Sequence, residues 1–257
     1  MHYFALNVII ELGIRRAKSM TKRMHEIRDP IHTFIRLDTG EREVVDTPPV
    51  QRLRYIHQLA LSHLIYPGAT HKRFEHSLGV MELAGRVFDV VTMPENIHHE
   101  IVRKLVPAAD ELRYWRRVLR MAALYHDVGH LPFSHAAEHE LLPESWDHER
   151  LTVEILRGSE MDAIWQAMTP PLRWLDIVKL AVGPKKCAAY ARSGALPAEA
   201  AEFTDWQSIL AEIIVGDAFG VDRDGLPAAR FVSRRRRVRP LRPSPADRHA
   251  AHSAEVV

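Results

Sequence analysis

Three histidines and one aspartate stand within ten residues near the middle of the chain, at His126, Asp127, His130 and His135. Imidazole and carboxylate groups that converge away from water must be paired, and a divalent cation satisfies both types at once. The cluster therefore predicts a metal site. The alternative is a histidine-rich turn whose side chains are satisfied by backbone groups, and this segment alone leaves both interpretations open.

An apolar run must carry this cluster into the interior. Residues 118–124 are almost entirely apolar, which predicts a helix buried on nearly every face, and the polar cluster begins where Gly129 and Pro132 should end that helix. A second helix with a wide apolar face follows His76. A lone histidine at such a position is more often a satisfied core residue, so His76 becomes a ligand candidate only if it meets His126.

A further histidine and a carboxylate lie beyond the cluster, at His148 and Glu149. Either Asp147 or Ser145 can cap the helix that continues to residue 156, which places both residues in its first turn. Backbone N–H groups and the helix dipole favour anions there. The position suits contact with a phosphate.

Length and composition bound the class of protein. The 257 residues, 46% of them hydrophobic, can bury one substantial core. No run approaches the roughly 20 apolar residues of a membrane span, and the single cysteine, Cys187, excludes an internal disulfide and fits a reducing compartment. We expect a cytoplasmic protein without a membrane partner, in which Cys187 is a passive thiol.

The remaining pattern predicts an all-α core with one small β-hairpin. Alternation over residues 31–37, the turn signal at 38–40 and Val44-Val45 predict the hairpin. Pro48 and Pro49 predict the start of a helix that ends before Pro67. Further helices are expected around 172–181, 185–193 and 206–215, with breaks at prolines and glycines, and residues 1–19 form a short amphipathic helix candidate.

Charge divides the chain unevenly. The net charge is +2, but residues 224–257 hold eight Arg against three acids, a balance of +5, which leaves about −3 for residues 1–223. The prolines and low apolar content of 224–257 predict a disordered tail. Its run of four arginines, 234–237, could bind nucleic acid, although a solvated tail is the favoured interpretation. We therefore divide the chain into an extension (1–26), a domain (27–223) and a tail (224–257).

Five ordered motifs together resemble the HD-domain deoxynucleoside triphosphate triphosphohydrolases, the family of bacterial dGTPases and of the animal enzyme with a sterile-alpha-motif domain. They are Asp-Pro-Ile-His at 29–32, Asp-Thr-Pro-Pro-Val-Gln-Arg-Leu-Arg at 46–54, Pro-Gly-Ala-Thr-His-Lys-Arg-Phe-Glu-His-Ser-Leu-Gly at 67–79, the stretch 126–135, and Trp-Asp-His-Glu at 146–149. The resemblance implies metal-dependent cleavage of a deoxynucleoside triphosphate, dGTP for example, into deoxynucleoside and inorganic triphosphate.

The resemblance also implies a metal-ligand set. The matching positions are His76, His126, Asp127 and Asp222. Asp217 is a rival carboxylate in the same segment, and the residues flanking Asp222 favour the latter. A site of two imidazoles and two carboxylates suits Mn, Mg, Fe or Zn, and the sequence does not choose among them.

Other roles follow from the same resemblance. His135 is the candidate general acid, oriented by Glu138, although spacing does not settle which histidine is the acid. His130, His148 and Arg73 are candidates to hold or protonate the phosphate chain. Matching positions add Glu149 to the catalytic candidates, and Gln58, Leu59 and Arg223 to the substrate-binding ones. Gln58 can equally be a solvated amide at a helix end. Relatives in this family form homo-oligomers, so a homo-oligomer is a further expectation.

The match ends after residue 223, where the family continues with further helices. The abrupt change of composition predicts a truncation or a change of reading frame, and hence reduced activity. Two alternatives to the triphosphohydrolase therefore stay open. One is an HD phosphohydrolase of another nucleotide or phosphate ester. The other is an impaired HD fragment that binds metal or nucleotide without turnover.

Overall fold

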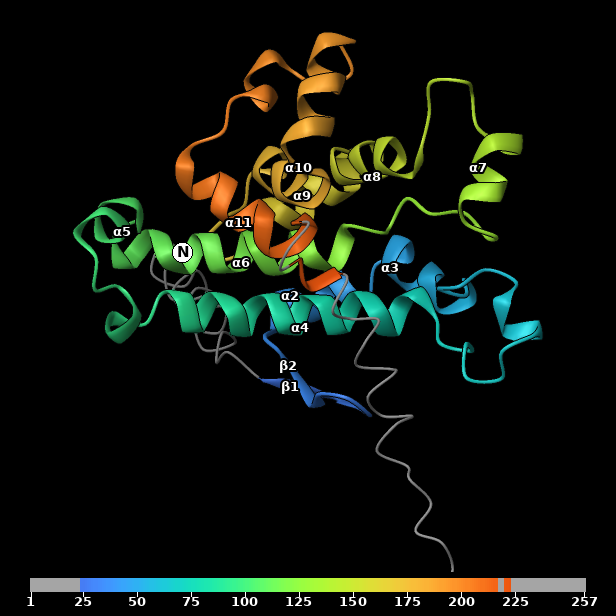
Figure 1. Ribbon diagram of the computed structural model, residues 1–257, viewed down its shortest axis with the longest axis horizontal. Helices are drawn as coiled ribbons and strands as arrows, with labels where there is room; N and C mark the ends of the chain where they lie inside the picture. The colour runs from blue at the N-terminus through green and yellow to red at the C-terminus, as the bar shows by residue number, and fades with distance from the viewer. Residues whose placement is uncertain (1–23, 217–219, 223–257) are drawn as a thin grey trace, which may run out of the picture.

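The structure is a computed structural model that describes residues 24–216 and 220–222. A two-stranded hairpin leads into a set of helices, as the sequence predicts (Figure 1). The elements in chain order are β1 (His25–Asp29), β2 (Thr33–Leu37), α2 (Thr39–Val45), α3 (Pro48–Arg52), α4 (Arg73–Val91), α5 (Glu100–Leu105), α6 (Ala109–Tyr125), α7 (His135–Leu141), α8 (His148–Leu156), α9 (Ser159–Ala167), α10 (Trp174–Arg192) and α11 (Asp205–Val215), with four short 3₁₀ turns between them.

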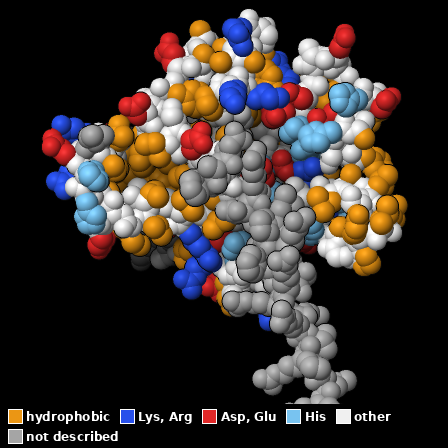
Figure 2. Space-filling view, viewed as in Figure 1, with side chains coloured by type: hydrophobic (Ala, Val, Ile, Leu, Met, Phe, Trp, Pro, Cys, Tyr) orange, Lys and Arg blue, Asp and Glu red, His pale blue; other side chains and the backbone are white. Residues whose placement is uncertain are grey.

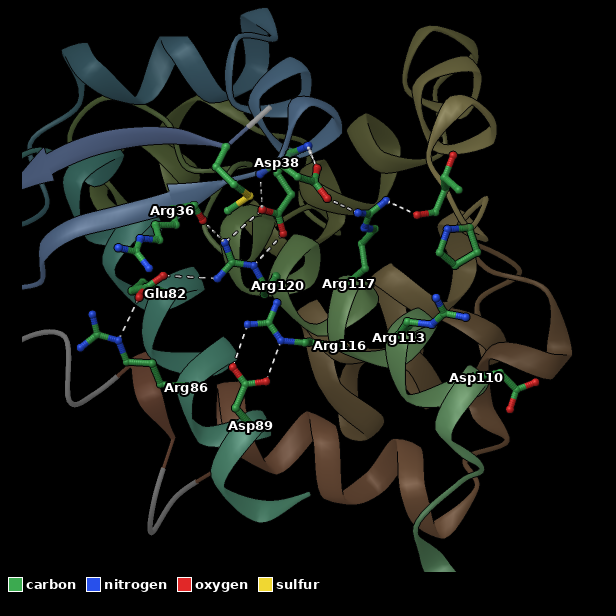
Figure 3. Close-up of a pocket in the computed structure, with 14 residues that line it drawn as sticks. Arg36, Asp38, Glu82, Arg86, Asp89, Asp110, Arg113, Arg116, Arg117 and Arg120 are labelled. Atoms are coloured by element: carbon green, nitrogen blue, oxygen red, sulfur yellow. Dashed lines mark hydrogen bonds and ion pairs between the residues drawn. The ribbon is translucent and has the colours of Figure 1, made fainter. Parts of the chain in front are cut away.

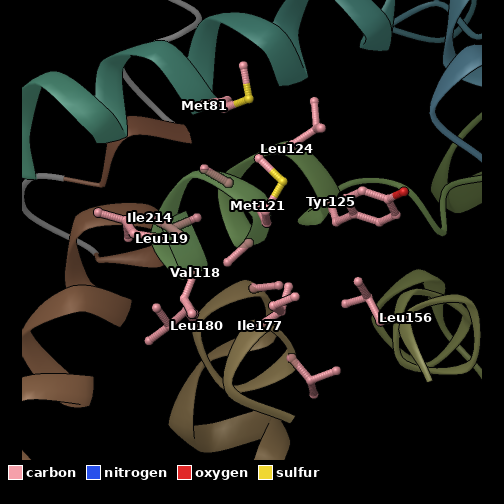
Figure 4. Packing of buried hydrophobic residues seen from close by; sticks show 14 of the residues in the cluster. Met81, Val118, Leu119, Met121, Leu124, Tyr125, Leu156, Ile177, Leu180 and Ile214 are labelled. Carbon is pink, nitrogen blue, oxygen red and sulfur yellow. The ribbon is translucent and has the colours of Figure 1, made fainter. Parts of the chain in front are cut away.

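Helix α6 lies at the centre of the core. Its residues Val118 to Tyr125 are buried on every side, as the apolar run predicts. Helix α4 packs along one side of α6 and α10 along another, with α11 against both α10 and α4. Figure 4 shows Met121 and Leu124 of α6 among side chains from α4, α8, α10 and α11. The end of α6 is therefore held from several directions, and the histidine cluster begins there.

The hairpin is present but lies earlier in the chain than predicted. Strands β1 and β2 pair antiparallel with Ile27 opposite Ile35. Asp38 does not begin a turn, because its side chain accepts a hydrogen bond from the Glu41 backbone while the Glu41 side chain accepts one from the Asp38 backbone. This capping box starts α2, so the predicted second strand at Val44-Val45 was wrong. Asp-Thr-Gly is both a turn signal and a helix-cap signal, and the sequence pattern alone does not separate them.

The helix predicted between Pro48 and Pro67 is much shorter than expected. It ends at Arg52 and continues only as a 3₁₀ turn to Tyr55. The next residues pair with the chain that precedes α4, since Arg73 donates its backbone N–H to Ile56 (2.9 Å) and Gln58 donates to His71 (3.1 Å). Tertiary pairing therefore competes successfully with helical spacing, and it draws Gln58 toward the start of α4.

Other boundaries agree with the sequence. Helix α8 is capped by Asp147, one of the two predicted cap residues. Helix α10 has its predicted interruption at Gly183, whose φ of 77° is non-helical. The predicted N-terminal helix and the basic tail lie outside the described residues. No helix within 24–216 or 220–222 is both long enough and apolar enough to cross a membrane.

Candidate metal centre and active site

Two histidines and an aspartate converge where α4 begins and α6 ends. The Nε2 atoms of His76 and His126 lie 2.9 Å and 3.1 Å from the same oxygen, Oδ1 of Asp222. The two imidazole rings are 5.3 Å apart, centroid to centroid. Ligand atoms around one cation stand about 3–4 Å apart when each bond is roughly 2 Å. Residues separated by 146 positions in the sequence thus share one site of the right size for a divalent ion.

The ring of His126 is oriented for coordination through Nε2. Its Nδ1 lies 2.7 Å from the Ala123 carbonyl oxygen, so Nδ1 carries the proton and donates it. A backbone carbonyl that fixes the tautomer in this way is the usual support for a metal-binding histidine. The Nε2 atom is then the ring nitrogen that faces Asp222, at 3.1 Å.

Electrostatics also favour positive charge at this point. Burial lowers the pKa of His126, but the carboxylates of Asp127 and Asp222 outweigh burial and raise that pKa to about 9. Burial would raise the pKa of Asp222, yet the neighbouring His126 and His76 hold it well below its ordinary value. The two carboxylates that would keep a proton on His126 would equally stabilise a cation that replaces it.

Asp127 joins this centre to a second group of histidines. Its Oδ1 is 3.6 Å from His126 Nε2 and 3.5 Å from His130 Nε2. Its Oδ2 accepts hydrogen bonds from Arg73 and, at 3.4 Å, from the side-chain amide of Gln58. One buried carboxylate therefore divides its oxygens between two functions. Oδ1 faces the imidazoles, and Oδ2 is held by Arg73 and Gln58.

The second group contains three imidazoles around Glu138. His130 and His148 stack with ring centroids 3.7 Å apart, and the His135 ring lies 5.2 Å from His130. Glu138 Oε2 is 3.1 Å from His148 Nδ1 and 3.4 Å from His135 Nδ1. The His135 side chain is 70% exposed whereas His130 is buried. His135 is therefore the member of this group that faces solvent.

A glycine allows α8 to approach the histidine motif. A Cβ on Gly129 would lie 1.9 Å from the carbonyl oxygen of His148, so no other residue fits without moving the helix. The Gly129 N–H donates to the hydroxyl of Thr152, one turn further along α8 (3.0 Å). This close backbone contact sets His148 against His130. In a single sequence Gly129 predicts only a helix end, so its packing role needed the structure.

Sequence analysis missed two residues of α10, Lys186 and Tyr190, that support the start of α8. Asp147 caps α8 by accepting the Arg150 N–H, and its side chain also contacts Lys186 (2.6 Å) and Tyr190 (2.5 Å). Burial raises the pKa of Asp147, but the bonds from Lys186 and Tyr190 outweigh it and lower that pKa to about 2. Lys186 also reaches Glu149 at 3.1 Å. The positions of Lys186 and Tyr190 on α10 could not predict this role, because it depends on the packing of α10 beside α8.

The loop before α7 is conformationally unusual. Phe133 and Ser134 have φ values of 71° and 54°, although neither is glycine. Such strain persists only where the surroundings impose it, and it is concentrated at functional sites. The Ser134 hydroxyl accepts a hydrogen bond from Arg73 at 2.7 Å, so the arginine that holds Asp127 also fixes the residue before His135.

The structure thus brings most of the predicted site residues together. His76, His126 and Asp222 form one group, with Asp127 Oδ1 3.6 Å from His126 Nε2, and His130, His135, Glu138 and His148 form the adjoining group. Glu149 lies at its edge, 3.3 Å from His148, and Gln58 reaches Asp127. Leu59 is 39% exposed beside Gln58, with no described contact that assigns it a role. Arg223 and the rival carboxylate Asp217 lie outside the described residues.

These residues fit a divalent cation by number and type. Two imidazoles and two carboxylates form a mixed N/O donor set, and the buried ring of His126 has its Nε2 directed at the centre. Such a set accepts Mn, Mg, Fe or Zn, and the geometry does not distinguish among them.

Comparison with known proteins assigns the class. Residues 73–182 match the family model of the HD domain, a range that includes all but two of the residues that meet at the site. The chain therefore contains an HD domain, and its predicted resemblance to HD-domain deoxynucleoside triphosphate triphosphohydrolases is confirmed over the matched part.

Individual relatives sharpen the assignment. Deoxynucleoside triphosphate triphosphohydrolase SAMHD1 of Bos taurus is 40% identical over 51% of this chain, and that of Danio rerio is 31% identical over 79%. The chain spans only 21% and 32% of the length of these two relatives. A hypothetical protein of Aquifex aeolicus has a similar structure, with a TM-score of 0.57, 28% identity, and coverage of 79% of this chain and 45% of its own.

Proposed function

We propose that the protein is a metal-dependent phosphohydrolase that converts deoxynucleoside triphosphates into deoxynucleoside and inorganic triphosphate. The observation that carries this proposal is the shared oxygen of Asp222, which joins His76 to His126 beside Asp127. The similarity to deoxynucleoside triphosphate triphosphohydrolases supports the choice of substrate. Within that proposal, His76, His126, Asp127 and Asp222 would hold the cation, which supplies Lewis acidity and a more acidic bound water.

The arrangement of the adjoining histidines supports a division of labour. Burial lowers the pKa of His130, an effect that Asp127 only partly offsets, and the shift favours the neutral ring, which suits hydrogen bonding with a phosphate oxygen. His135 is exposed and lies against Glu138, so it can deliver a proton to the 5′-oxygen that leaves as the bond to the α-phosphorus breaks. His148, in the first turn of α8, and Arg73 would position the phosphate chain, and Glu149 would act through His148, from which its carboxylate lies 3.3 Å.

Gln58 is suited to contact the sugar. Its amide donates a hydrogen bond to Asp127 Oδ2 at 3.4 Å, so a sugar hydroxyl bound by Gln58 would lie next to Asp127, one of the proposed metal ligands. An amide that hydrogen-bonds the 3′-hydroxyl selects substrates that carry this hydroxyl, because a substrate without it would leave the amide unpaired. Leu59, the next residue, would line the same side of the substrate.

A product assay tests this function. We expect the purified full chain, incubated with each deoxynucleoside triphosphate and Mn²⁺ or Mg²⁺, to release deoxynucleoside and inorganic triphosphate in equal amounts. The matched variant Asp127→Asn keeps a side-chain acceptor for Arg73 but removes the charge that a cation needs, so release should stop. Arg103→Gln, an exposed change on α5, is the charge control. Orthophosphate or pyrophosphate as product would indicate a different HD phosphohydrolase, and metal uptake without any turnover would contradict the proposal.

The predicted homo-oligomer stays a prediction. A surface on which to test it is the segment 55–66, where Tyr55, Leu64, Ile65 and Tyr66 are each at least 65% exposed. Figure 2 shows hydrophobic side chains gathered at the right-hand edge of the molecule, where Figure 1 places this segment. Large exposed apolar patches mark interaction surfaces more often than chance. Sedimentation of the wild type and of Leu64→Ser/Ile65→Ser measures whether the segment joins two copies.

A further inference from the structure

A second feature of the molecule lies at the opposite end of the α4–α6 pair from the histidines. Four arginines of α6, Arg113, Arg116, Arg117 and Arg120, follow the helical spacing i, i+3, i+4, i+7 and so form one stripe. Two members of the stripe meet α4, since Arg116 binds Asp89 and Arg120 binds Glu82 (Figure 3). Glu82, Arg86 and Asp89 of α4 have the same type of spacing and line the same cavity. Asp89 is 13 residues beyond His76 in a helix that rises about 1.5 Å per residue, so this end lies roughly 20 Å from the metal centre.

The two stripes line a cavity of about 920 Å³. This volume is at the upper end of the range of small-molecule sites. Six arginines line it, namely Arg36, Arg86, Arg113, Arg116, Arg117 and Arg120, together with five acidic residues, Asp38, Glu41, Glu82, Asp89 and Asp110. A helix stripe that packs against a neighbour is usually apolar. A stripe made only of arginines carries a desolvation cost that packing alone does not explain.

The inner arginines are completely engaged by the protein. Arg120 is 3% exposed and donates to Glu41, Glu82 and the Arg36 carbonyl. Arg117 is bound by Asp38 and by the Thr169 carbonyl (2.5 Å). Their charges are neutralised and their positions fixed, so they form a rigid wall of the cavity and are not available to a ligand.

The outer arginines keep donors that the described part of the chain does not use. Arg116 binds Asp89 through Nε and Nη2, and Arg86 binds Glu82 through Nε, so each retains an Nη1 group without a hydrogen bond to the described part of the chain. Arg113 makes no hydrogen bond or ion pair with residues 24–216 or 220–222, and Figure 3 draws no dashed line from it. A guanidinium group has five N–H donors in a planar fork that matches phosphate oxygens.

We infer that this cavity is a second ligand site, which binds a small anion carrying two or more phosphate groups through Arg86, Arg113 and Arg116. The ion pairs with Glu82 and Asp89 hold Arg86 and Arg116 in place, so the site is organised before the ligand arrives. Arg113 supplies a charge that no described carboxylate neutralises. Asp110, which also lines the cavity without a described partner, opposes the anion. The site does not depend on the metal centre or on the proposed hydrolase activity.

Calorimetric titration of the full chain with inorganic triphosphate tests the inference. EDTA in the buffer removes divalent cations, so the HD centre cannot bind the probe through a metal. We expect one site per chain, with affinity that falls as KCl rises. Arg113→Gln should weaken binding about tenfold and Arg113→Gln/Arg116→Gln about a hundredfold, whereas Asp110→Asn should strengthen it several-fold.

Matched controls make the result decisive. Arg103→Gln removes an exposed arginine from α5 and should leave the affinity unchanged, and Arg73→Gln removes the arginine of the HD centre and should also leave it unchanged. Arg113→Gln breaks no described contact, so its thermal midpoint should equal that of the wild type. The inference would be overturned if the wild type did not bind the probe at all. It would also be overturned if Arg103→Gln lost as much affinity as Arg113→Gln, or if Arg73→Gln lost affinity and Arg113→Gln did not.

The source of the phosphates is distinguished by a second titration. Equal affinity for inorganic triphosphate and for a nucleoside triphosphate would show that the cavity reads phosphate alone, and tighter nucleotide binding would add a contact to the nucleoside. Both results support the site. Binding of single-stranded DNA without any binding of triphosphate would overturn it, because the inferred ligand is a small anion.

Discussion

The two ends of the α4–α6 pair treat charge in opposite ways. At the histidine end, His76 and His126 share one oxygen of Asp222, and the buried atoms Arg73 Nε and Gln58 Oε1 have no hydrogen-bond partner among the described residues. At the arginine end, Arg117 and Arg120 have a protein partner for each charged group. Incompletely satisfied buried polar groups indicate a missing ligand, whereas fully paired ones indicate structure. The comparison teaches that one helix pair can carry a reactive end and an end whose inner arginines form a rigid wall.

The largest expected effect is loss of the metal at the histidine end. His126→Gln removes the Nε2 that faces Asp222, so bound Mn should fall to background and triphosphate release by about a thousandfold, since the cation supplies several kcal/mol of transition-state stabilisation. Elemental analysis after dialysis and the product assay measure the two effects. Arg103→Gln should retain both metal and activity. Full metal content in His126→Gln would break the assignment of this end.

The arginine end should respond in stability. Arg120→Met leaves Glu41, which is 6% exposed, with a buried charge and no cation, so the free energy of unfolding should fall by about 3–5 kcal/mol. Urea denaturation measures this change. The double variant Arg120→Met/Glu41→Gln should recover most of the loss, because it removes both charges. A single variant that costs less than about 1 kcal/mol would show that these pairs do not hold the wall of the cavity.

Gly129 tests whether the reactive end depends on close backbone packing. Gly129→Ala would place a methyl group 1.9 Å from the His148 carbonyl oxygen, so α8 must shift. We expect a loss of about 1–3 kcal/mol in the free energy of unfolding, and weaker turnover because His148 moves away from His130. Gly68→Ala is the control, since no atom lies within 4 Å of its added Cβ. Equal stability of the two variants would contradict the packing argument.

The smallest effect concerns the support of α8. Asp147→Asn keeps a helix cap but loses the charge that meets Lys186, so it should cost about 1 kcal/mol or less at pH 7. The folded pKa of Asp147 is lowered to about 2, so its stabilisation is complete above the ordinary carboxyl pKa and disappears as pH falls toward 2. Thermal midpoints of variant and wild type should therefore converge between pH 4 and pH 2. When Lys186→Met is also present, the difference in thermal midpoint between Asp147 and its Asn replacement at pH 7 should be smaller.

The sequence predicted the helices well where one physical signal dominated. The apolar run before His126 gave a buried helix, and Asp147 gave a helix cap, because burial and capping are local consequences of residue type. The hairpin and the helix after Pro48 were misplaced, because Asp38 satisfies two local patterns and because residues 56–58 pair with a distant segment. Local periodicity contains no information about such partners.

The residues of the candidate site could be predicted, but the residues that hold them in place could not. The meeting of Asp222 with His76 and His126 followed from resemblance to a family, since spacing alone cannot join residues 96 or more positions apart. Lys186 and Tyr190 could not be found before the packing of α10 on α8 was known. The arginine stripe of α6 was readable at helical spacing, yet arginines on helices are ordinarily solvated, so only the facing acids of α4 reveal its role.

The divided carboxylate of Asp127 has a consequence for anyone who wishes to redesign this protein. One oxygen contacts both groups of imidazoles while the other is held by Arg73 and Gln58, so under the proposed function a single substitution there would disturb ion uptake, proton delivery and sugar selection together. Effects of changes among these neighbours will therefore not add. Altering the preferred substrate or the preferred ion calls for replacing the whole set as one module.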